Sequence, residues 1–401
     1  MQKNKPLNLE FVGLMAALMS IVALTIDAIL PAISQIGIAI NSFDSSAHQL
    51  LITMIFLGLG LGQLVFGPFS DSFGRKPTVY AGFSIFVVAS IICVLSQSLE
   101  MMVVGRILQG IGLSAPRTIS ISIIRDTYKG DYMAKIMSFV TSVFILVPVI
   151  APALGKFVMN HYSWKGIFYV QLVMAILVCI WFWRRQPETL KPEFKTKFTR
   201  HVFINGVKEL IKHKETMGFT VISGFITGAF MVYLSASQHI FENQYNLVEE
   251  FPFIFAGLAS GIGVSTLLNG TLVMRLGMRR LSFLALIVFT LNAFVYILLF
   301  WSTANPSLTI LLLFMGIQFS TIGFIFGNIR AIAMEPIGHI AGIGAAITGF
   351  SATLLAVPIA TVIGHYVGDT ALPLFIGFSI FGLLSLSVFV KMKAFKAIPV
   401  D

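Results

Sequence analysis

The chain has 401 residues, of which 57% are hydrophobic and 11% charged, and its formal net charge is +10. Soluble domains carry about 25% charged residues, so the composition excludes an ordinary soluble protein and indicates a chain that crosses a membrane many times. The basic residues lie in short segments between apolar stretches. No basic, aromatic-rich stretch is present on which bases could stack, which argues against nucleic-acid binding.

Twelve stretches are apolar and long enough, at about 20 residues, to cross the hydrocarbon core. They fall at 11–34, 48–69, 78–97, 101–124, 133–158, 165–184, 217–240, 251–274, 281–301, 307–331, 340–366 and 370–391. This six-plus-six pattern predicts an N-terminal six-helix bundle (1–184), a polar linker (185–215) and a C-terminal six-helix bundle (216–401). One such chain holds a complete pathway, so we expect a monomer.

The lysines and arginines predict the orientation, because positive charge is retained on the cytoplasmic side. Most of them fall in the two terminal segments, in the central linker and in alternate loops. Lys156 and Lys165 lie near the other ends of the fifth and sixth spans. Both termini are therefore expected in the cytoplasm, with the chain in the inner membrane of a bacterium.

Asp27 lies within the first apolar span. A charged aspartate at the bilayer centre costs about 2.5–3.5 kcal/mol, so it needs a partner, a proton or a function. Arg106, in the fourth span, is expected at similar depth, which makes a direct or water-mediated contact feasible. We predict that Asp27 exchanges the proton and that Arg106 modulates it. The alternative is a static ion pair.

The segment GPFSDSFGRKP (67–77) links the second and third spans. Gly67 and Gly74 have the same spacing as Gly270 and Gly277 between the eighth and ninth spans. Glycines at matching loops indicate two parallel repeats, an architecture that one class of transporters uses.

Charged residues in this segment predict a cluster at the cytoplasmic ends of the helices. Asp71 is expected to cap the eleventh span near Ile340, and Arg75 to pair with Asp126. The alternative is a solvated loop that only sets topology. The predicted latch between the two halves comprises Gly67, Asp71, Gly74, Arg75, Lys76 and Asp126.

The fourth span contains GRILQGIGLSAPR (105–117). Arg106, Gln109 and Arg117 lie on one helical stripe, and arginines facing lipid would be costly, so the stripe is expected to face an interior cavity. Arg106 could instead form a structural ion pair, and Arg117 could extend to the cytoplasm.

The fifth span contains VPVIAPALGK (147–156). Pro148 and Pro152 each remove a backbone donor, which predicts a bend. Gly155 suits close packing, whereas Lys156 next to it does not.

In the second half we expect four polar residues in the substrate cavity, and the alternative is ordinary hydrogen bonding between helices. They are Tyr233, Ser237, Gln318 and Thr321. Tyr233 is the preferred contact, because an aromatic ring with a hydroxyl suits amphipathic ligands. Gln109 and Arg117 complete the predicted cavity. No histidine or cysteine spacing predicts a metal or cofactor.

Several of these motifs resemble the major facilitator superfamily. The 67–77 loop is similar to the family's G-x-L-x-D-R-x-G-R-K/R loop, and Arg106, Gln109 and Gly110 match its R-x-x-Q-G motif. The segment at Pro152 resembles the antiporter motif G-P-x-x-G-G, with Lys156 in place of the final glycine. DAILP (27–31), RDTY (125–128) and MEPIGHIAG (334–342) extend the resemblance to the twelve-span drug:proton antiporters of the Bcr/CflA branch.

This resemblance implies an all-α major facilitator fold, with two six-helix bundles related by a pseudo-twofold axis along the membrane normal. It implies a proton-driven exporter that works by alternating access and is no enzyme. The balance of interior charges favours neutral, zwitterionic or weakly anionic substrates. Alternatives are export of a self-made metabolite such as a siderophore, a metabolite:proton symporter, and a membrane-embedded enzyme or sensor.

Overall fold

The computed structural model describes residues 8–42, 45–128, 130–195, 200–302 and 305–392, and the regular structure in these ranges is helical throughout. The N-half, as we call the helices before the linker, consists of α1 (Leu9–Asp27), η1 (Leu30–Ala32), α2 (Ile33–Ala39), α3 (Ser45–Phe73), α4 (Arg75–Leu95), α5 (Leu99–Thr127), α6 (Gly130–His161) and α7 (Trp164–Arg185).

The linker contains η2 (Pro192–Phe194) and α8 (Arg200–Lys212). The C-half consists of α9 (Lys214–Gln238), η3 (His239–Gln244), α10 (Phe251–Leu276), α11 (Met278–Phe300), α12 (Leu308–Met334), η4 (Glu335–Ile340), α13 (Ala341–Tyr366) and α14 (Leu372–Lys391). Helix α8 was not predicted; its Leu210 packs on Ile337 and Ile347, which places the linker against the C-half.

Eleven helical segments among the described residues are long and apolar enough to cross a membrane. Helix α6, with 32 residues, occupies the fifth place in the series and completes the twelve expected spans. Many large apolar side chains, such as Val88, Leu177, Leu298 and Leu313, are exposed on the outside of the helices. In a bilayer these side chains contact lipid, which accounts for an apolar surface that water would not tolerate.

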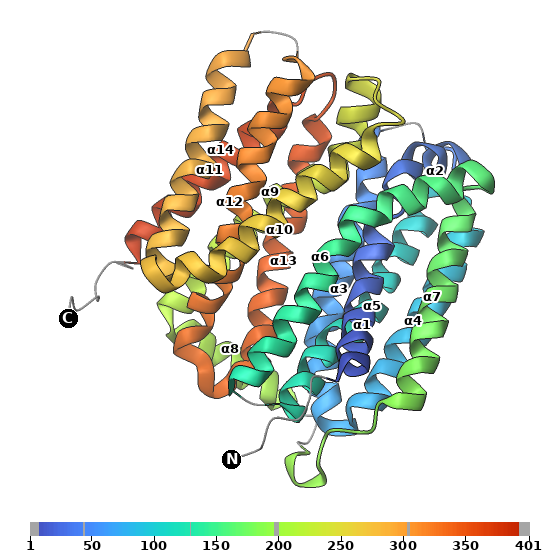
Figure 1. The fold of residues 1–401 in the computed structure, drawn as a ribbon, viewed down its shortest axis with the longest axis vertical. Coiled ribbons are helices and arrows are strands. Elements are labelled where there is room, and N and C mark those ends of the chain that lie inside the picture. Colours follow the sequence, from blue (N-terminus) through green and yellow to red (C-terminus); the bar gives the residue numbers. More distant parts are fainter. Residues whose placement is uncertain (1–7, 43–44, 129, 196–199, 303–304, 393–401) are drawn as a thin grey trace.

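The two halves lie side by side, with α1 and α3–α7 on one side and α9–α14 on the other (Figure 1). Helices α3 and α13, α6 and α10, and α9 and η1 are in contact along the boundary between them, which we call the seam. This is the all-α, two-bundle arrangement that the sequence predicts.

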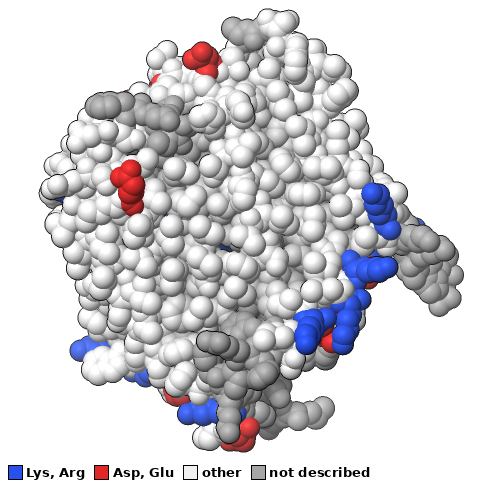
Figure 2. All heavy atoms as spheres, turned by 180° about the vertical axis from the view of Figure 1, so that it is seen from behind, with Lys and Arg blue, Asp and Glu red and all other residues white. Residues whose placement is uncertain are grey.

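Lysine and arginine side chains gather at one end of the molecule (Figure 2). We call this end the basic face; α4 and α11 begin there and α5 ends there, and the basic residues next to these helix ends include Lys76, Arg125 and Arg280. The opposite face carries Lys156, Glu242, Glu249 and Asp369. A wide, nearly uncharged band separates the two ends in this view, as expected for the part of a protein that crosses hydrocarbon.

The first predicted span is not one continuous helix. Helix α1 ends at Asp27, and the chain reaches Ala39 through η1 and α2. Pro31 explains the break, because it has no N–H to donate to the carbonyl of Asp27 four residues earlier. Asp27 therefore lies at the end of a helix and not in the middle of a continuous span.

The two glycine turns have matching backbone geometry. Gly74 precedes α4 with φ of 115°, and Gly277 precedes α11 with φ of 76°. Residues other than glycine rarely adopt such angles. The internal repeat predicted from their spacing thus corresponds to the same turn in each half.

Candidate functional site

A cavity of about 360 Å³ lies between the two halves toward the basic face. Helices α3 and α5 of the N-half and α9, α12 and α13 of the C-half line it. Its polar lining residues are Gln63, Asp71, Ser72, Arg117, Thr118, Ser122, Arg125, Thr220, Ser223, Thr227, Arg330, Thr348 and Thr353.

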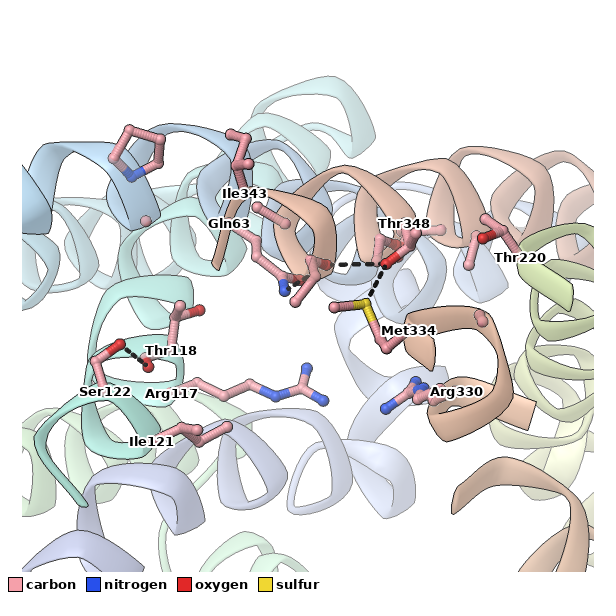
Figure 3. A pocket seen from close by; sticks show the side chains of 18 of the residues that line it. Gln63, Arg117, Thr118, Ile121, Ser122, Thr220, Arg330, Met334, Ile343 and Thr348 are labelled. Carbon is pink, nitrogen blue, oxygen red and sulfur yellow. Dashed lines mark hydrogen bonds between the residues drawn. The ribbon is translucent and has the colours of Figure 1, made fainter. Parts of the chain in front are cut away.

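Two arginines face each other across this cavity. The side chain of Arg117 extends from α5 and that of Arg330 from α12, with the two guanidinium groups pointing toward one another (Figure 3). Arg330 lies near the ring of Phe326, 5.9 Å from its centroid. Neither guanidinium forms a hydrogen bond or ion pair with the described residues.

The proton-site candidate, Asp27, lies deeper in the N-half. Its exposed fraction is 5%. Its carboxylate forms no hydrogen bond or ion pair in the described ranges. Across the seam, η1, which follows Asp27, contacts α9, the helix that carries Tyr233. The Tyr233 hydroxyl is itself buried and has no hydrogen-bond partner among the described residues.

The expected direct contact between Asp27 and Arg106 is not formed. Arg106 is fully buried, and its Nε donates to the Leu51 carbonyl at 2.8 Å. Its Nη1 and Nη2 each lie 3.3 Å from the Thr25 carbonyl. Nη1 also donates to Gln109 Oε1 at 2.8 Å. A carbonyl group at the end of a helix lacks a helical donor. The Thr25 carbonyl, at the broken end of α1, therefore accepts the Arg106 guanidinium that we expected to pair with Asp27.

Helix α6, which carries the VPVIAPALGK segment, packs closely against the broken end of α1. A Cβ added to Gly155 would collide with the carbonyl oxygen of Ala28, the residue after Asp27. Lys156 does not prevent the contact. Its Nζ reaches the C-half instead, 3.2 Å from Glu249 Oε1 and 3.3 Å from the Val248 carbonyl. Pro148 and Pro152 both lie inside α6, which runs as one uninterrupted helix from Gly130 to His161.

Of the six predicted substrate-cavity residues, Arg117 alone lines the described cavity. The other five are used between or within helices. Gln109 donates to Ser90 at 2.8 Å, and Gln318 bonds Asn292 of α11 at 2.7 Å. Thr321 and Ser237 donate to carbonyls of their own helices, and Tyr233 stands among phenylalanines at the seam. Helical spacing predicts a shared face but does not decide which neighbour that face contacts.

The sequence interpretation missed Arg330 as a cavity residue, although it falls within the apolar stretch at 307–331. It belongs to α12, four residues before the helix ends. A lysine or arginine at the end of an apolar span is ordinary, so the sequence offers no signal that this one points inward. Gln63, Thr220 and Thr348 were also missed, because single uncharged polar residues are common inside apolar spans and carry no signal of the surface they face.

On the basic face, Arg75 pairs with Asp126 at 2.8 Å, as predicted, and with Asp71 at 2.5 Å. The predicted cap of α13 by Asp71 is wrong for the described residues, because the carboxylate is turned back to Arg75 in the next helix. Gly67 and Gly74 flank this cluster, and Lys76 donates to the Trp183 carbonyl at 3.2 Å. Among the described residues, the ion pairs and hydrogen bonds of the charged cluster reach the N-half and the start of the linker but not the C-half, so they do not form the latch between halves that we expected.

Glu188, after α7, completes this cluster. Its carboxylate accepts hydrogen bonds from the backbone N–H groups of Arg75 and Lys76, at 3.0 and 2.9 Å, and from Thr189 and Leu190. Burial by itself would raise the pKa of Glu188, but these four donors hold it below its ordinary value of 4.5. The carboxylate thus caps the N-terminus of α4.

Arg279 has a corresponding place in the C-half. It forms ion pairs with Glu215 of α9 and with Glu335, the latter at 2.8 Å. Each half therefore has a basic residue, just after a glycine with positive φ, that is bonded to carboxylates from neighbouring segments.

Comparison with known proteins identifies relatives along most of the chain. The "Uncharacterized MFS-type transporter YdgK" of Bacillus subtilis is 28% identical over 85% of both chains. The "Bicyclomycin resistance protein homolog" of Haemophilus influenzae is 26% identical over 87% of both. The "Multidrug resistance protein MdtL" of Citrobacter koseri is 32% identical over 39% of this chain and 40% of its own.

Solved structures share the fold. The crystal structure of a D-xylose-proton symporter has a TM-score of 0.76 at 15% identity and covers 97% of each chain. The human organic anion transporter MFSD10 has a TM-score of 0.68 at 14% identity. The Major Facilitator Superfamily profile matches residues 14–360. This chain, with its two bundles and a cavity between them, therefore belongs to the Major Facilitator Superfamily and is a multi-pass membrane transporter, not an enzyme.

Proposed function

We propose that the protein is a proton-coupled exporter of amphipathic small molecules that works by alternating access, with Asp27 as the exchangeable proton site. One observation carries the proposal: Asp27 is a buried carboxyl group with no cationic partner, next to the seam between the halves. An intramembrane carboxylate of this kind is typical of proton relays. The names of the bicyclomycin-resistance and multidrug-resistance relatives support export as the direction.

The basic face is the cytoplasmic one in this proposal, because positively charged loops are retained on that side. Both termini then lie in the cytoplasm of a bacterium, and the membrane is its inner membrane. The cavity opens toward the compartment from which an exporter takes its substrate. Lys156, Glu249 and the α6–α10 contact close the opposite side of the seam.

Coupling follows from the position of Asp27 between moving parts. Ala28 contacts Gly155 of α6 within the N-half, whereas η1 contacts α9, the helix of Tyr233, across the seam. A rocking motion of the two bundles, here residues 1–184 and 216–401 about the linker 185–215, moves α9 relative to Asp27 and leaves the Ala28–Gly155 contact intact within its bundle. Asp27 then receives a proton from one side and releases it to the other. Arg106 acts by holding the Thr25 carbonyl, and so positions the end of α1.

The test is proton release induced by substrate. Purified protein is reconstituted in liposomes with a trapped pH-sensitive dye, and a panel of antibiotics that includes bicyclomycin is added. We expect Asp27→Asn to abolish the proton signal while the protein stays folded. Glu10→Gln is the matched control, because Glu10 is an exposed carboxylate of the same helix, paired with Arg185 at 2.9 Å.

Undiminished proton release by Asp27→Asn would remove Asp27 from this role. Substrate that moves in the same direction as the protons would overturn export in favour of symport. The thermal unfolding midpoint of each variant shows whether a lost signal reflects lost structure.

A further inference from the structure

The described cavity is lined by three positive groups, Arg117, Arg125 and Arg330, and by no free negative group that would balance them. Asp71 is the one carboxylate among its described lining residues, and it lies 2.5 Å from Arg75 Nη1. Arg117 and Arg330 have no acid near them in the described ranges. Two like charges that face each other across a cavity repel, and no described lining carboxylate is free to balance them, so the arrangement favours an anionic ligand.

Arginine is suited to that ligand. A guanidinium group presents its donors as a planar fork that matches a carboxylate, sulfonate or phosphate. Arg117 lies ten residues before the end of α5, roughly 15 Å along the helix axis, so it is too deep to serve as a surface charge. Arg330 approaches from the other half, and Figure 3 shows the space between the two side chains.

The rest of the lining is suited to an apolar body with a few polar groups. Met334 lies beside Thr348 of α13, Ile121 lies near Arg117 of α5, and Ile343 also lines the cavity. The cavity volume of about 360 Å³ falls within the range of small-molecule sites.

We propose that Arg117 and Arg330 together bind the anionic group of an amphipathic organic anion, so that this class is the substrate of the transporter. The inference rests on the proposed export function, whose substrate class it names. Because one arginine comes from each half, the bound anion removes the repulsion across the seam. Substrate binding thereby favours closure of the basic face, the first movement of an export cycle.

The test is binding at equilibrium, which needs neither a gradient nor turnover. Full-length protein in phosphatidylcholine nanodiscs is dialysed against 2-naphthoate or 2-naphthamide, two ligands of the same shape that differ in charge. We expect saturable binding of 2-naphthoate, weakened at least about tenfold by Arg117→Gln or Arg330→Gln. Binding of 2-naphthamide should be weak and unaffected by either variant.

Two further variants separate the site from general effects. Arg280→Gln removes the same charge from the same face outside the cavity and should leave 2-naphthoate binding unchanged. Arg117→Lys should recover part of the binding, since the charge remains but the fork is lost. Nanodiscs with added phosphatidylglycerol test a lipid source: if that lipid competes with 2-naphthoate through the same two arginines, the anion of this site includes a lipid headgroup.

Equal binding of the two ligands, no saturable 2-naphthoate binding at millimolar concentration, or 2-naphthoate binding that survives both glutamine variants would overturn the proposal. Failure of the export proposal is distinguishable, because it appears as normal proton release by Asp27→Asn and leaves the dialysis result unaffected.

Discussion

Arg106 illustrates how a conspicuous residue can have an unexpected partner. Its motif and depth are readable from the sequence, and so is the need to satisfy a buried cation. The partner is not readable, because the acceptors are main-chain carbonyls of Thr25 and Leu51. Every residue has such a carbonyl, and the break of α1 leaves the carbonyl of Thr25 without a helical donor.

We predict that Arg106→Lys lowers stability. One ammonium group cannot reach both the Thr25 and Leu51 carbonyls. Leu51 lies inside α3 and keeps its helical donor, but a buried Thr25 carbonyl left without a donor costs about 1–3 kcal/mol. The thermal unfolding midpoint in detergent should therefore fall, while Arg125→Lys, an exposed site on the same helix, should leave it unchanged. An unaltered midpoint for Arg106→Lys would contradict the tie between α1, α3 and α5.

Glu188 leads to a prediction about pH. Because its pKa in the folded protein is below the ordinary 4.5, its stabilising contribution is complete above that pH. This contribution is lost as the pH falls below 4.5 and through the lowered pKa that Glu188 has in the folded protein. The wild type should thus unfold at a higher temperature than Glu188→Gln at pH 6–8, and the difference should shrink below pH 4.5. A difference that grows on acidification would be the wrong sign for this cap.

At the scale of elements, the contact between α1 and α6 helps to position Asp27, the proposed proton site. Gly155 allows the two backbones to approach, and the sequence predicts this property of the residue. The sequence does not identify Ala28 as the surface that it meets, since the two positions are more than 120 residues apart.

We therefore predict that Gly155→Ala moves α6 away from α1 and impairs coupling. The added methyl group meets a backbone oxygen, which cannot turn aside as a flexible side chain would. Substrate-induced proton release should fall at least severalfold. Gly257→Ala is the matched control, because a Cβ at that position of α10 meets no atom within 4 Å. Equal activity of the two variants would show that the close approach is unimportant for transport.

At the scale of the whole molecule, the seam is open toward the basic face and closed at the other. Lys156 contributes to the closed side by reaching from α6 to Val248 and Glu249 of the C-half. The family motif favours glycine at this position, so the lysine adds a contact between halves that the motif does not provide.

We predict that Lys156→Met loosens the closed side. In protein with Cys93 and Cys179 replaced by serine, a cysteine at Ser34 reports on that side, where Ser34 accepts a hydrogen bond from Gln238 across the seam. Loss of the lysine contacts, worth about 1 kcal/mol, should raise the rate of maleimide labelling about fivefold. Lys165→Met should leave the rate unchanged, since the Lys165 ammonium lies over Trp164 within the N-half. Identical rates in both variants would exclude Lys156 as a closing contact.

The sequence by itself determined the number and order of the spans, the internal repeat, the family and the pair Arg75–Asp126. These depend on hydropathy, on glycine conformation and on short motifs, all of which are local properties of a chain. Only the tertiary structure decided that Arg106 serves a helix end, that the described ion pairs of the charged cluster stay within the N-half, and that Arg330 faces Arg117. The reason is physical: helical spacing fixes which side chains share a face, but packing decides what that face meets.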